Sequence, residues 1–320
     1  MRAESGEREP RAEERGRVLK KSGSVLCRGP EEKYAMIRKH HVGLVSIARA
    51  CQLCGVSRSG YYAWRTRPAG RGDEVLGRKV KGIFDKSNKA YGTRRIKREL
   101  EKEGIVISRK KISRLMNEEG LVAKARRKTR ATTNSEHGMP VAPNVLGRQF
   151  EVDSPNTVWV GDITYLATTE GWLYLAVVID LYSRKVVGWS IGKRMTKALV
   201  LNALMMAIAI RKPGRGLVFH SDRGSQYCSH AYQQLLARHG FVCSMSRKGE
   251  CQDNACAESF FHSLKVEWIY GEPLKSRHMM KRLVRAYIEV FYNRQRLHSK
   301  LGYLSPCDYE KNNSTFSMSA

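Results

Sequence analysis

The sequence predicts a mixed α/β domain in the second half of the chain, preceded by an all-α region. Between residues 156 and 310, runs rich in β-branched and aromatic residues alternate with amphipathic segments, a pattern typical of strands and helices in one domain. Before residue 120, apolar residues recur at helical spacing between glycines and candidate caps. A chain of 320 residues is long enough for two or three domains with a substantial core.

The charge distribution indicates a polyanionic partner. The formal net charge is +28, and residues 1–150 hold 36 Lys and Arg against 16 Asp and Glu, while the remainder holds 22 against 14. The basic excess is therefore concentrated in the first half of the chain. Double-stranded DNA fits such an excess best. The alternative is a basic protein whose charge serves solubility alone.

Cysteine usage and hydropathy indicate a cytoplasmic protein. No stretch approaches the ~18 apolar residues that a membrane-spanning helix needs, and residues 1–17 lack the apolar core of a secretory signal. The eight cysteines show no framework spacing, which suits free thiols in a reducing compartment. Cys51 and Cys54 form a lone pair that we interpret as thiols rather than half of a zinc site.

The first part of the all-α region resembles a helix-turn-helix. Residues 1–34 are charged and poor in aromatics, so we expect disorder there. Residues 35–66 predict two helices separated by Gly55, with Ser57 as N-cap of the second. Arg58 and Arg65 lie on that second helix, where they either contact DNA or flank a small packing helix.

A second basic helical pattern completes the region 35–120. Residues 73–120 predict three helices, with Ser108 capping the last and Gly120 ending it. Lys110, Lys111 and Arg114 lie on this last helix, and they either read DNA or form a solvated basic face. Residues 121–155 are basic, rich in Ser and Thr and interrupted by prolines, so we interpret them as a linker.

The second half of the chain, residues 156–310, predicts five strands and at least four helices. The order is three consecutive strands, then helix, strand, helix, strand and helix, which is the order of an RNase H-like α/β core with a mixed five-stranded sheet and its first strand at the centre. A C-terminal helix follows over 275–295, and 311–320 form a tail. We expect strands at 157–168, 172–181, 185–193, 217–222 and 241–246, and helices at 196–211, 229–239 and 254–270.

Three carboxylates stand out in this half. Asp162 lies within the first predicted strand, Asp222 follows the apolar run LVFHS, and Glu258 lies on a helical segment, with 35 residues between Asp222 and Glu258. Taken singly, each could be a turn residue, a helix cap or a surface charge. If they converge, their mutual repulsion must be relieved by protons or by hard cations such as Mg²⁺. Two such ions roughly 3.5–4 Å apart could clamp both reacting oxygens of a phosphodiester.

The motifs carry a family resemblance. The array of Asp162, Asp222 and Glu258, with HSDRGSQY around the second acid and DNACAESFFHSLK around the third, resembles the DDE core of retroviral-integrase-type transposases. The chain is more narrowly similar to the OrfB transposases of the IS-three family of bacterial insertion sequences. Further likeness lies in VSRSGYYAW, YGTRRIKREL, HGMPVAPNVLGRQF and YNRQRLHSKLGYLSP, over roughly residues 35–310.

The resemblance implies a mechanism and partners. A DDE transposase uses Asp162, Asp222 and Glu258 with two Mg²⁺ ions (or Mn²⁺) to cleave and join the ends of its element. It acts on double-stranded DNA, as a homo-oligomer, in the bacterial nucleoid, and with the OrfA product as a further partner. A basic residue two helical turns after the third acid, here Lys265, touches DNA near the scissile phosphate; otherwise Lys265 is a surface lysine.

Two other functions remain open from the residues. An RNase H-like nuclease would cut without joining, and a non-catalytic regulator would only bind the ends of the element. Near the three acids, we interpret Asp253 as a helix cap rather than a ligand, Asp180 as structural, and His220 as a packed histidine or a hydrogen-bond donor close to Asp222.

Overall fold

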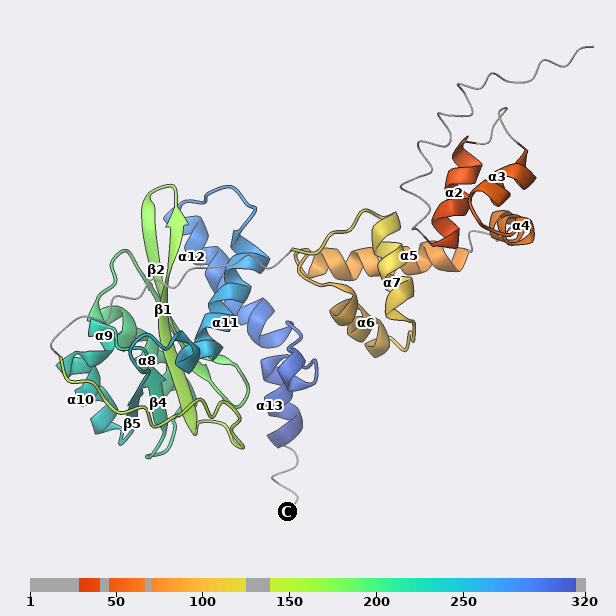
Figure 1. Cartoon of the computed structure of the whole chain (residues 1–320). Helices are drawn as coiled ribbons and strands as arrows, with labels where there is room; N and C mark the ends of the chain where they lie inside the picture. Colours follow the sequence, from red (N-terminus) through yellow and green to blue (C-terminus); the bar gives the residue numbers. More distant parts are fainter. Residues whose placement is uncertain (1–28, 41–45, 67–70, 125–138, 315–320) are drawn as a thin grey trace, which may run out of the picture. The chain divides into compact units, whose positions relative to one another are not determined.

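The computed structural model describes residues 29–40, 46–66, 71–124 and 139–314. Most of the expected disordered segment, the middle of the expected linker and the last six residues of the tail lie outside these ranges. The chain divides into two compact units, one ending at Leu76 and the other beginning at Gly77 (Figure 1). In the described ranges, no helix combines the length and the apolar character that crossing a membrane requires.

The first unit contains a helix-turn-helix as expected. Its helices are α2 (Pro30–His40), α3 (Ile47–Leu53) and α4 (Arg58–Thr66). Gly55 follows α3 with φ of +63°, and the Ser57 hydroxyl accepts a hydrogen bond from the Gly60 amide at 3.0 Å, so both predicted boundary signals are confirmed. However, α2 begins at Pro30, so the expected disorder up to residue 34 is wrong for its last residues. The glutamates at 31 and 32 favour this helix start.

Three helices follow, and the first of them starts before Gly77, so it runs across the boundary between the two units. They are α5 (Arg71–Lys86), α6 (Thr93–Lys102) and α7 (Arg109–Glu118). Ile96 and Leu100 of α6 and Ile112 of α7 are fully buried. The Ser108 hydroxyl caps α7 by accepting from the Lys111 amide at 3.2 Å. The expected single region 35–120 is therefore split, because α6 and α7 belong to the unit that also holds the sheet.

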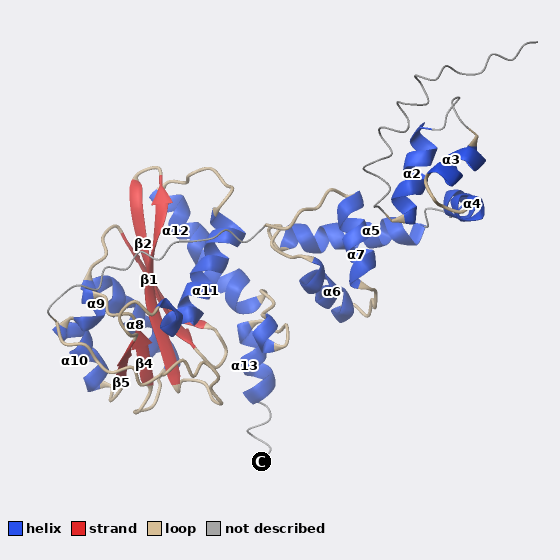
Figure 2. Cartoon of the chain, in the orientation of Figure 1, coloured by secondary structure: helices blue, strands red, loops and turns tan. Residues whose placement is uncertain are grey.

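A five-stranded mixed sheet forms the centre of this unit, as predicted (Figure 2). The strand order is β3-β2-β1-β4-β5, with β1 in the middle. Strands β1, β2 and β3 pair antiparallel, whereas β1–β4 and β4–β5 pair parallel. The strands are β1 (Val158–Thr168), β2 (Gly171–Asp180), β3 (Val186–Gly192), β4 (Val218–Ser221) and β5 (Val242–Met245).

Helices complete the unit. One hydrophobic cluster joins the sheet to α8, α9 and α10, with Trp159, Leu204 and Phe219 fully buried. Gly188 permits the close approach of α8, because a Cβ there would lie 2.2 Å from the Ala203 carbonyl oxygen. The helices are α8 (Lys197–Arg211), α9 (Ser225–Cys228), α10 (His230–Arg238), α11 (Ala255–Leu264), α12 (Arg277–Ala286) and α13 (Pro306–Ser314), with short 3-10 turns at Cys251–Asn254 and Ser299–Leu301.

Two helices of the unit continue as π-helix. Alpha-helix α11 runs into the π-helix η2 (Lys265–Ile269), and α12 runs into η3 (Tyr287–Tyr292). The predicted helices over 254–270 and 275–295 are therefore each a composite. A π-helical segment re-aims the side chains that follow it, and such segments are often found at functional sites.

The buried carboxylate of Glu267 on η2 ties α6 to this part of the unit. Its oxygens accept from Arg296 Nη2 at 2.6 Å and Nε at 2.8 Å, from Arg95 Nη1 of α6 at 3.4 Å, and from the Tyr287 hydroxyl at 3.2 Å. The backbone carbonyl of Glu267 accepts from Asn88 Nδ2 at 2.8 Å and Lys124 Nζ at 2.9 Å. The helices before residue 124 are thus bonded directly to the segment that continues α11.

The described end of the expected linker packs on the sheet. Leu146 is buried, and the amides of Val145 and Leu146 both donate to the Ser244 hydroxyl of β5, at 2.9 and 3.1 Å. The linker interpretation is therefore wrong for residues 139–155. Likewise, α13 continues to Ser314, four residues into the expected tail.

Candidate active site

Asp162 and Asp222 are neighbours across two parallel strands. The register pairs Val158 with Val218 and Val160 with His220. Continued for two positions, the same register sets Asp222, the first residue after β4, beside Asp162. Neighbouring strands lie about 4.8 Å apart, and residues in register point to the same face. The fold therefore brings these two acids together, as the sequence predicted.

Glu258 is carried to the same place by α11. The side chain of Asn254, immediately before α11, donates from Nδ2 to the Gly161 carbonyl oxygen at 3.1 Å. This bond fastens the start of α11 to β1 one residue before Asp162, and Glu258 follows one helical turn later. Gly161 has no space for a side chain, because a Cβ there would lie 2.6 Å from Cζ of Phe219. Gly161 and Asn254 were missed in the sequence, since their roles depend on contacts between distant segments.

The three acids interact electrostatically. Burial raises the pKa of Asp162 well above its usual value, and the negative charges of Asp222 and Glu258 raise it further. The Ile163 amide, which donates to Asp162 Oδ1 at 2.8 Å, and the Lys265 ammonium oppose this rise. Glu258 is exposed, yet partial desolvation of its carboxyl raises its pKa too. Unneutralised negative charge is thus concentrated around Asp162.

Lys265 lies beside Asp162 and above an aromatic ring. Its Nζ is 4.8 Å from the centroid of the Tyr165 ring, a cation–π geometry. Partial burial lowers the pKa of Lys265, and the charge of Asp162 opposes that shift. Lys265 is the first residue of η2, so the change from α-helix to π-helix falls at this side chain.

The carboxylates are not drawn together into a closed cluster. Within the described ranges, no group of three or more His, Cys, Asp and Glu side chains is arranged to hold a metal ion. Instead, Asp222 Oδ1 accepts from the Gly224 amide at 2.9 Å, and Asp162 accepts from Ile163. Neighbouring ionised carboxylates repel one another, and the Lys265 ammonium offsets part of this repulsion at Asp162. The donor set nevertheless fits Mg²⁺, which prefers carboxylate oxygens.

Asp253 is structural, but it does not cap α11 as the sequence suggested. Its fully buried carboxylate accepts from Arg148 Nε at 2.6 Å, from Arg247 Nη2 at 3.1 Å and from Asn144 Nδ2 at 2.9 Å. The hydrogen bonds from Arg247 are the chief reason that the pKa of Asp253 lies well below its usual value. Asp253 therefore binds the 144–148 segment to the residues that precede α11.

Asp180 and His220 are structural as well. Asp180 accepts from Arg211 Nη2 at 3.2 Å and from the Asn156 amide at 2.8 Å. His220 shares hydrogen bonds with the hydroxyls of Ser244 at 2.8 Å and Ser246 at 3.2 Å, and burial lowers its pKa to about 4. His220 therefore connects β4 to β5 as a neutral, packed histidine.

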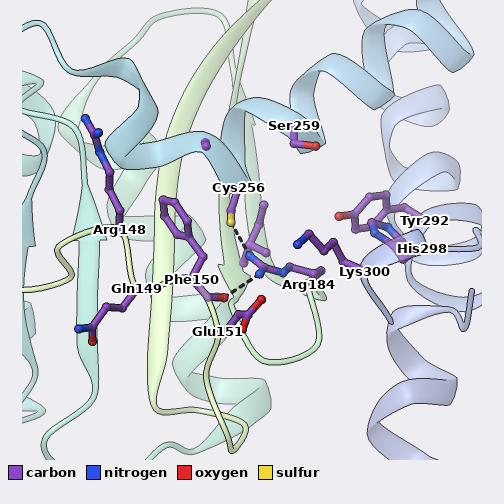
Figure 3. A pocket seen from close by; sticks show the side chains of 12 residues that line it. Arg148, Gln149, Phe150, Glu151, Arg184, Cys256, Ser259, Tyr292, His298 and Lys300 are labelled. Carbon is purple, nitrogen blue, oxygen red and sulfur yellow. Dashed lines mark hydrogen bonds between the residues drawn. The ribbon is translucent and has the colours of Figure 1, made fainter. Parts of the chain in front are cut away.

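A pocket lies beside the first turn of α11 (Figure 3). Cys256 and Ser259 line it from α11, and Arg184 and Lys300 line it from other segments. Arg184 donates from Nη2 to the Phe150 carbonyl at 2.7 Å and from Nη1 to the Cys256 sulfur. The guanidinium thus joins residue 150 to the helix that carries Glu258, and we assign it a structural role.

The basic residues expected on DNA have accessible positions. Arg58 and Arg65 are exposed on α4, and Lys110 is exposed on α7. Lys111 and Arg114 of α7 are half-buried, and Arg114 forms an ion pair with Glu118 at 3.6 Å. Their contact with DNA stays a prediction.

Comparisons with known proteins match this organisation. Residues 152–251 and 258–313 match two family models described as integrase core domain, and residues 71–129 match an HTH-like domain. The HTH-like match covers α5, α6 and α7. An integrase core preceded by a helix-turn-helix domain places this chain in the class of polynucleotidyl transferases, the enzymes that transfer DNA strands.

Similarity to curated proteins shows the family. The chain is 48% identical over 286 residues to the transposase InsF of insertion sequence IS3A from Escherichia coli K12, covering 88% of this chain and 99% of that protein. It is 47% identical over 264 residues to an uncharacterized 31 kDa protein of insertion element IS600 from Shigella sonnei, covering 82% and 97%. The chain belongs to the IS3 family of insertion-sequence transposases, so it is a DNA transposase.

One solved structure with a similar fold is the integrase catalytic core of HTLV-2 in complex with magnesium. It shares 17% identity and a TM-score of 0.37, and the match covers 48% of this chain and 96% of that one.

Proposed function

We propose that Asp162, Asp222 and Glu258 form the catalytic centre with which this transposase cleaves the ends of its element and joins them to target DNA. The proposal rests chiefly on the register of β1 and β4, which sets the two aspartates side by side in a fold where Asn254 brings the helix of Glu258 to the same point. The raised pKa of Asp162 reflects the same convergence of negative charge.

The centre is proposed to hold divalent cations, about two per site, with Mg²⁺ as the natural ion and Mn²⁺ as a substitute. When bound, such ions activate a water or a DNA 3′-hydroxyl and stabilise the departing oxygen. The carboxylates supply the oxygen ligands, so Asp162 must lose its proton despite its raised pKa. A cation in contact with Asp162 would lower that pKa again.

Lys265 is proposed to position the DNA strand. Its ammonium lies close enough to Asp162 to influence the pKa of that acid, and it lies over the Tyr165 ring. An ammonium beside a carboxylate centre can contact the backbone phosphate next to the scissile bond. Such phosphate contacts fix the register of the strand without reading its sequence.

The basic helices are proposed to bind the terminal repeats of the element. Arg58 and Arg65 on α4 and Lys110, Lys111 and Arg114 on α7 are the candidate contacts. Each phosphate contact releases counterions, so neutralising one of these side chains should lower the slope of log affinity against log salt by about 0.9. We also propose that the transposase acts as a homo-oligomer that holds two DNA ends, with the OrfA product as a further partner.

The test is a strand-transfer assay on duplexes that carry the terminal repeats of the element. With Mg²⁺, the wild type should produce joined products that disappear with EDTA. Asp162→Asn, Asp222→Asn and Glu258→Gln should each abolish joining while keeping end binding. Glu103→Gln, which changes an exposed carboxylate after α6, serves as the control and should join normally.

The same assay separates the other functions considered from the sequence. Cutting without joining would identify a nuclease, and binding without cutting would identify a regulator. Full joining by Asp222→Asn would contradict the assignment of the centre.

A further inference from the structure

A pocket lies at the edge of the sheet next to Lys265. We call it the edge pocket, and it lies between the β1–β2 hairpin and the segment 270–275 that leads to α12. Both sides supply apolar side chains, and Lys265 and Lys275 are the lysines among its lining residues. Residues that matter for the argument are Tyr165, Trp172, Lys265, Tyr270 and Leu274.

The walls of the edge pocket are held in place by hydrogen bonds. The Thr169 amide in the hairpin turn donates to the Lys275 carbonyl at 3.1 Å. The Arg277 amide at the start of α12 donates to Glu170 Oε2 at 2.5 Å, and Arg277 Nη2 donates to the Trp172 carbonyl at 3.4 Å. These bonds hold the β1–β2 hairpin and the 270–275 segment against each other. The pocket is preformed.

Two large aromatic side chains of the edge pocket are exposed. Trp172 is 51% exposed and Tyr165 is 41% exposed, although most large apolar residues of the sheet are fully buried. Their rings meet edge to face, with centroids 5.0 Å apart and planes at 86°. In this arrangement the indole face of Trp172 remains available as a flat stacking surface. Exposing such rings costs stability unless a ligand covers them.

Lys265 links the edge pocket to the proposed catalytic centre. Lys265 belongs to both, because its ammonium lies over the Tyr165 ring and acts on Asp162. Among the described residues, pairing of β1 with β4 ends at Val160, so the edge of β1 is open from Asp162 to Tyr165. Three strand residues span about 10 Å. Successive phosphates of one DNA strand are about 3.4 Å apart along the duplex axis. A nucleotide a few steps from the scissile phosphate could therefore reach the pocket.

We propose that the edge pocket receives an unpaired nucleobase from the DNA end whose backbone is held at the three carboxylates. The base stacks on Trp172, and Lys265 contacts an adjoining phosphate. A nucleotide fits because it combines a flat aromatic face with a negative charge, and the pocket pairs exposed aromatic side chains with the lysines Lys265 and Lys275. This inference rests on the proposed function, since it needs a DNA end at the catalytic centre. Removal of the base from the duplex would open the end next to the scissile bond.

The test is a coupling measurement between Trp172 and individual bases of the DNA end. Affinity is measured for duplexes carrying the terminal repeat, either intact or with one abasic nucleotide at each position near the scissile bond on either strand. The full chain carries Glu258→Gln, so that no DNA is consumed. Trp172→Leu removes the stacking surface and Trp172→Phe keeps an aromatic ring. Ile210→Ala is the control, because Ile210 is 60% exposed on α8, outside the pocket.

The expected result is a loss of affinity of roughly tenfold for Trp172→Leu on intact DNA, and little change for Trp172→Phe and Ile210→Ala. At one position, an abasic nucleotide should lower the affinity of the parent protein, which has Trp172. On that abasic duplex, the parent and Trp172→Leu should bind with equal affinity. The proposal is overturned if Trp172→Leu binds every duplex as tightly as its parent does. It is equally overturned if the loss is the same on intact and on all abasic duplexes.

The readout separates this proposal from the proposed function. If the effect of Trp172→Leu depends on one base but the wild type does not transfer strands, the edge-pocket proposal holds and the catalytic assignment is rejected. If the wild type transfers strands but the effect of Trp172→Leu depends on no base, the catalytic assignment holds and the edge-pocket proposal is rejected. Thermal unfolding of each variant checks that a loss of affinity does not come from misfolding.

Discussion

The position of Asp162 in the fold lowers the stability of the folded protein. Its carboxyl is partly buried beside two other acids, and both effects raise its pKa. A group whose pKa is raised on folding favours the folded state at low pH and disfavours it above its folded pKa. Above its folded pKa, without cations, the ionised Asp162 carboxyl therefore costs free energy of folding. Such a cost is common where a site must hold a ligand.

Asp162→Asn should thus stabilise the cation-free protein while abolishing strand transfer. The gain in free energy of unfolding should be on the order of 1 kcal/mol at pH 8. It should shrink as the pH falls through the pKa of Asp162, because the wild-type carboxyl is then protonated and neutral. Urea unfolding with EDTA at pH 8 and pH 5 measures both values. A destabilised Asp162→Asn at pH 8 would contradict the electrostatic account.

Gly161 is required for a different reason. A Cβ at this position would lie 2.6 Å from Cζ and 3.0 Å from Cε1 of the Phe219 ring, which is buried in the core. Gly161→Ala should therefore destabilise the protein by about 1–3 kcal/mol through overpacking. Strand transfer should fall as well, since the carbonyl that anchors Asn254 belongs to the same residue.

The matched control for this change is Gly82→Ala. Gly82 is exposed within α5, and a Cβ there meets no atom within 4 Å. Alanine should stabilise that helix by up to about 1 kcal/mol. If both substitutions changed the midpoint of thermal unfolding equally, the close packing at Gly161 would not matter.

At the scale of elements, the sequence predicted the sheet closely. Each of the five strands begins and ends within one residue of its predicted bounds, because β-branched runs end at clear turn signals. The short helix α9 and the change to π-helix at Lys265 were not predicted, since four residues carry no periodicity and no local pattern marks a π-helix. The packing of residues 139–155 was missed because its partner, Ser244, lies about 100 positions away in the chain.

The candidate site was predictable to a similar extent. Residue types and spacing selected Asp162, Asp222 and Glu258; the fold aligns the two aspartates and fastens the start of the Glu258 helix to β1. The β1–β4 register that aligns the two aspartates has no local signal, because parallel strands are joined by a long crossover. For the same reason the exposed pair of Tyr165 and Trp172 could not be seen as a surface.

The π-helix η2 gives a prediction at the same scale. Glu267→Ala would leave the buried guanidinium of Arg296 without its carboxylate, 2.6 Å away in the native protein. Breaking a buried pair by removing one partner costs about 3–5 kcal/mol. Glu267→Ala should therefore unfold at markedly lower denaturant concentration. Glu103→Ala, which breaks the exposed pair with Lys79, should change the unfolding midpoint very little.

A second experiment tests whether the contact between α6 and Glu267 affects catalysis as well as folding. Arg95 on α6 and Lys124 bond to Glu267, whereas Glu258 lies on the helix that η2 continues. Arg95→Met removes one donor and leaves the Arg296 pair intact. We expect it to reduce strand transfer more than end binding. An equal effect on both would mean that this contact only supports folding.

The whole molecule combines a basic, helical first half with a second half that carries the three carboxylates. The first 150 positions hold 36 basic and 16 acidic residues, and this basic excess attracts DNA. The half of the chain that forms the sheet is expected to carry out the reaction. The family similarity extends over 88% of the chain, so it includes the HTH-like helices and the integrase core together. The two halves are therefore expected to act on one DNA end.

The most direct test of the central claim is a measurement of divalent-cation binding at the three acids. Mn²⁺ is titrated into the DNA-bound protein and the free ion is counted by electron paramagnetic resonance. The wild type and Glu103→Gln should bind about two ions per catalytic centre, and Asp222→Asn should lose this binding together with strand transfer. Undiminished Mn²⁺ binding by Asp222→Asn would contradict the claim that these carboxylates hold the catalytic metal.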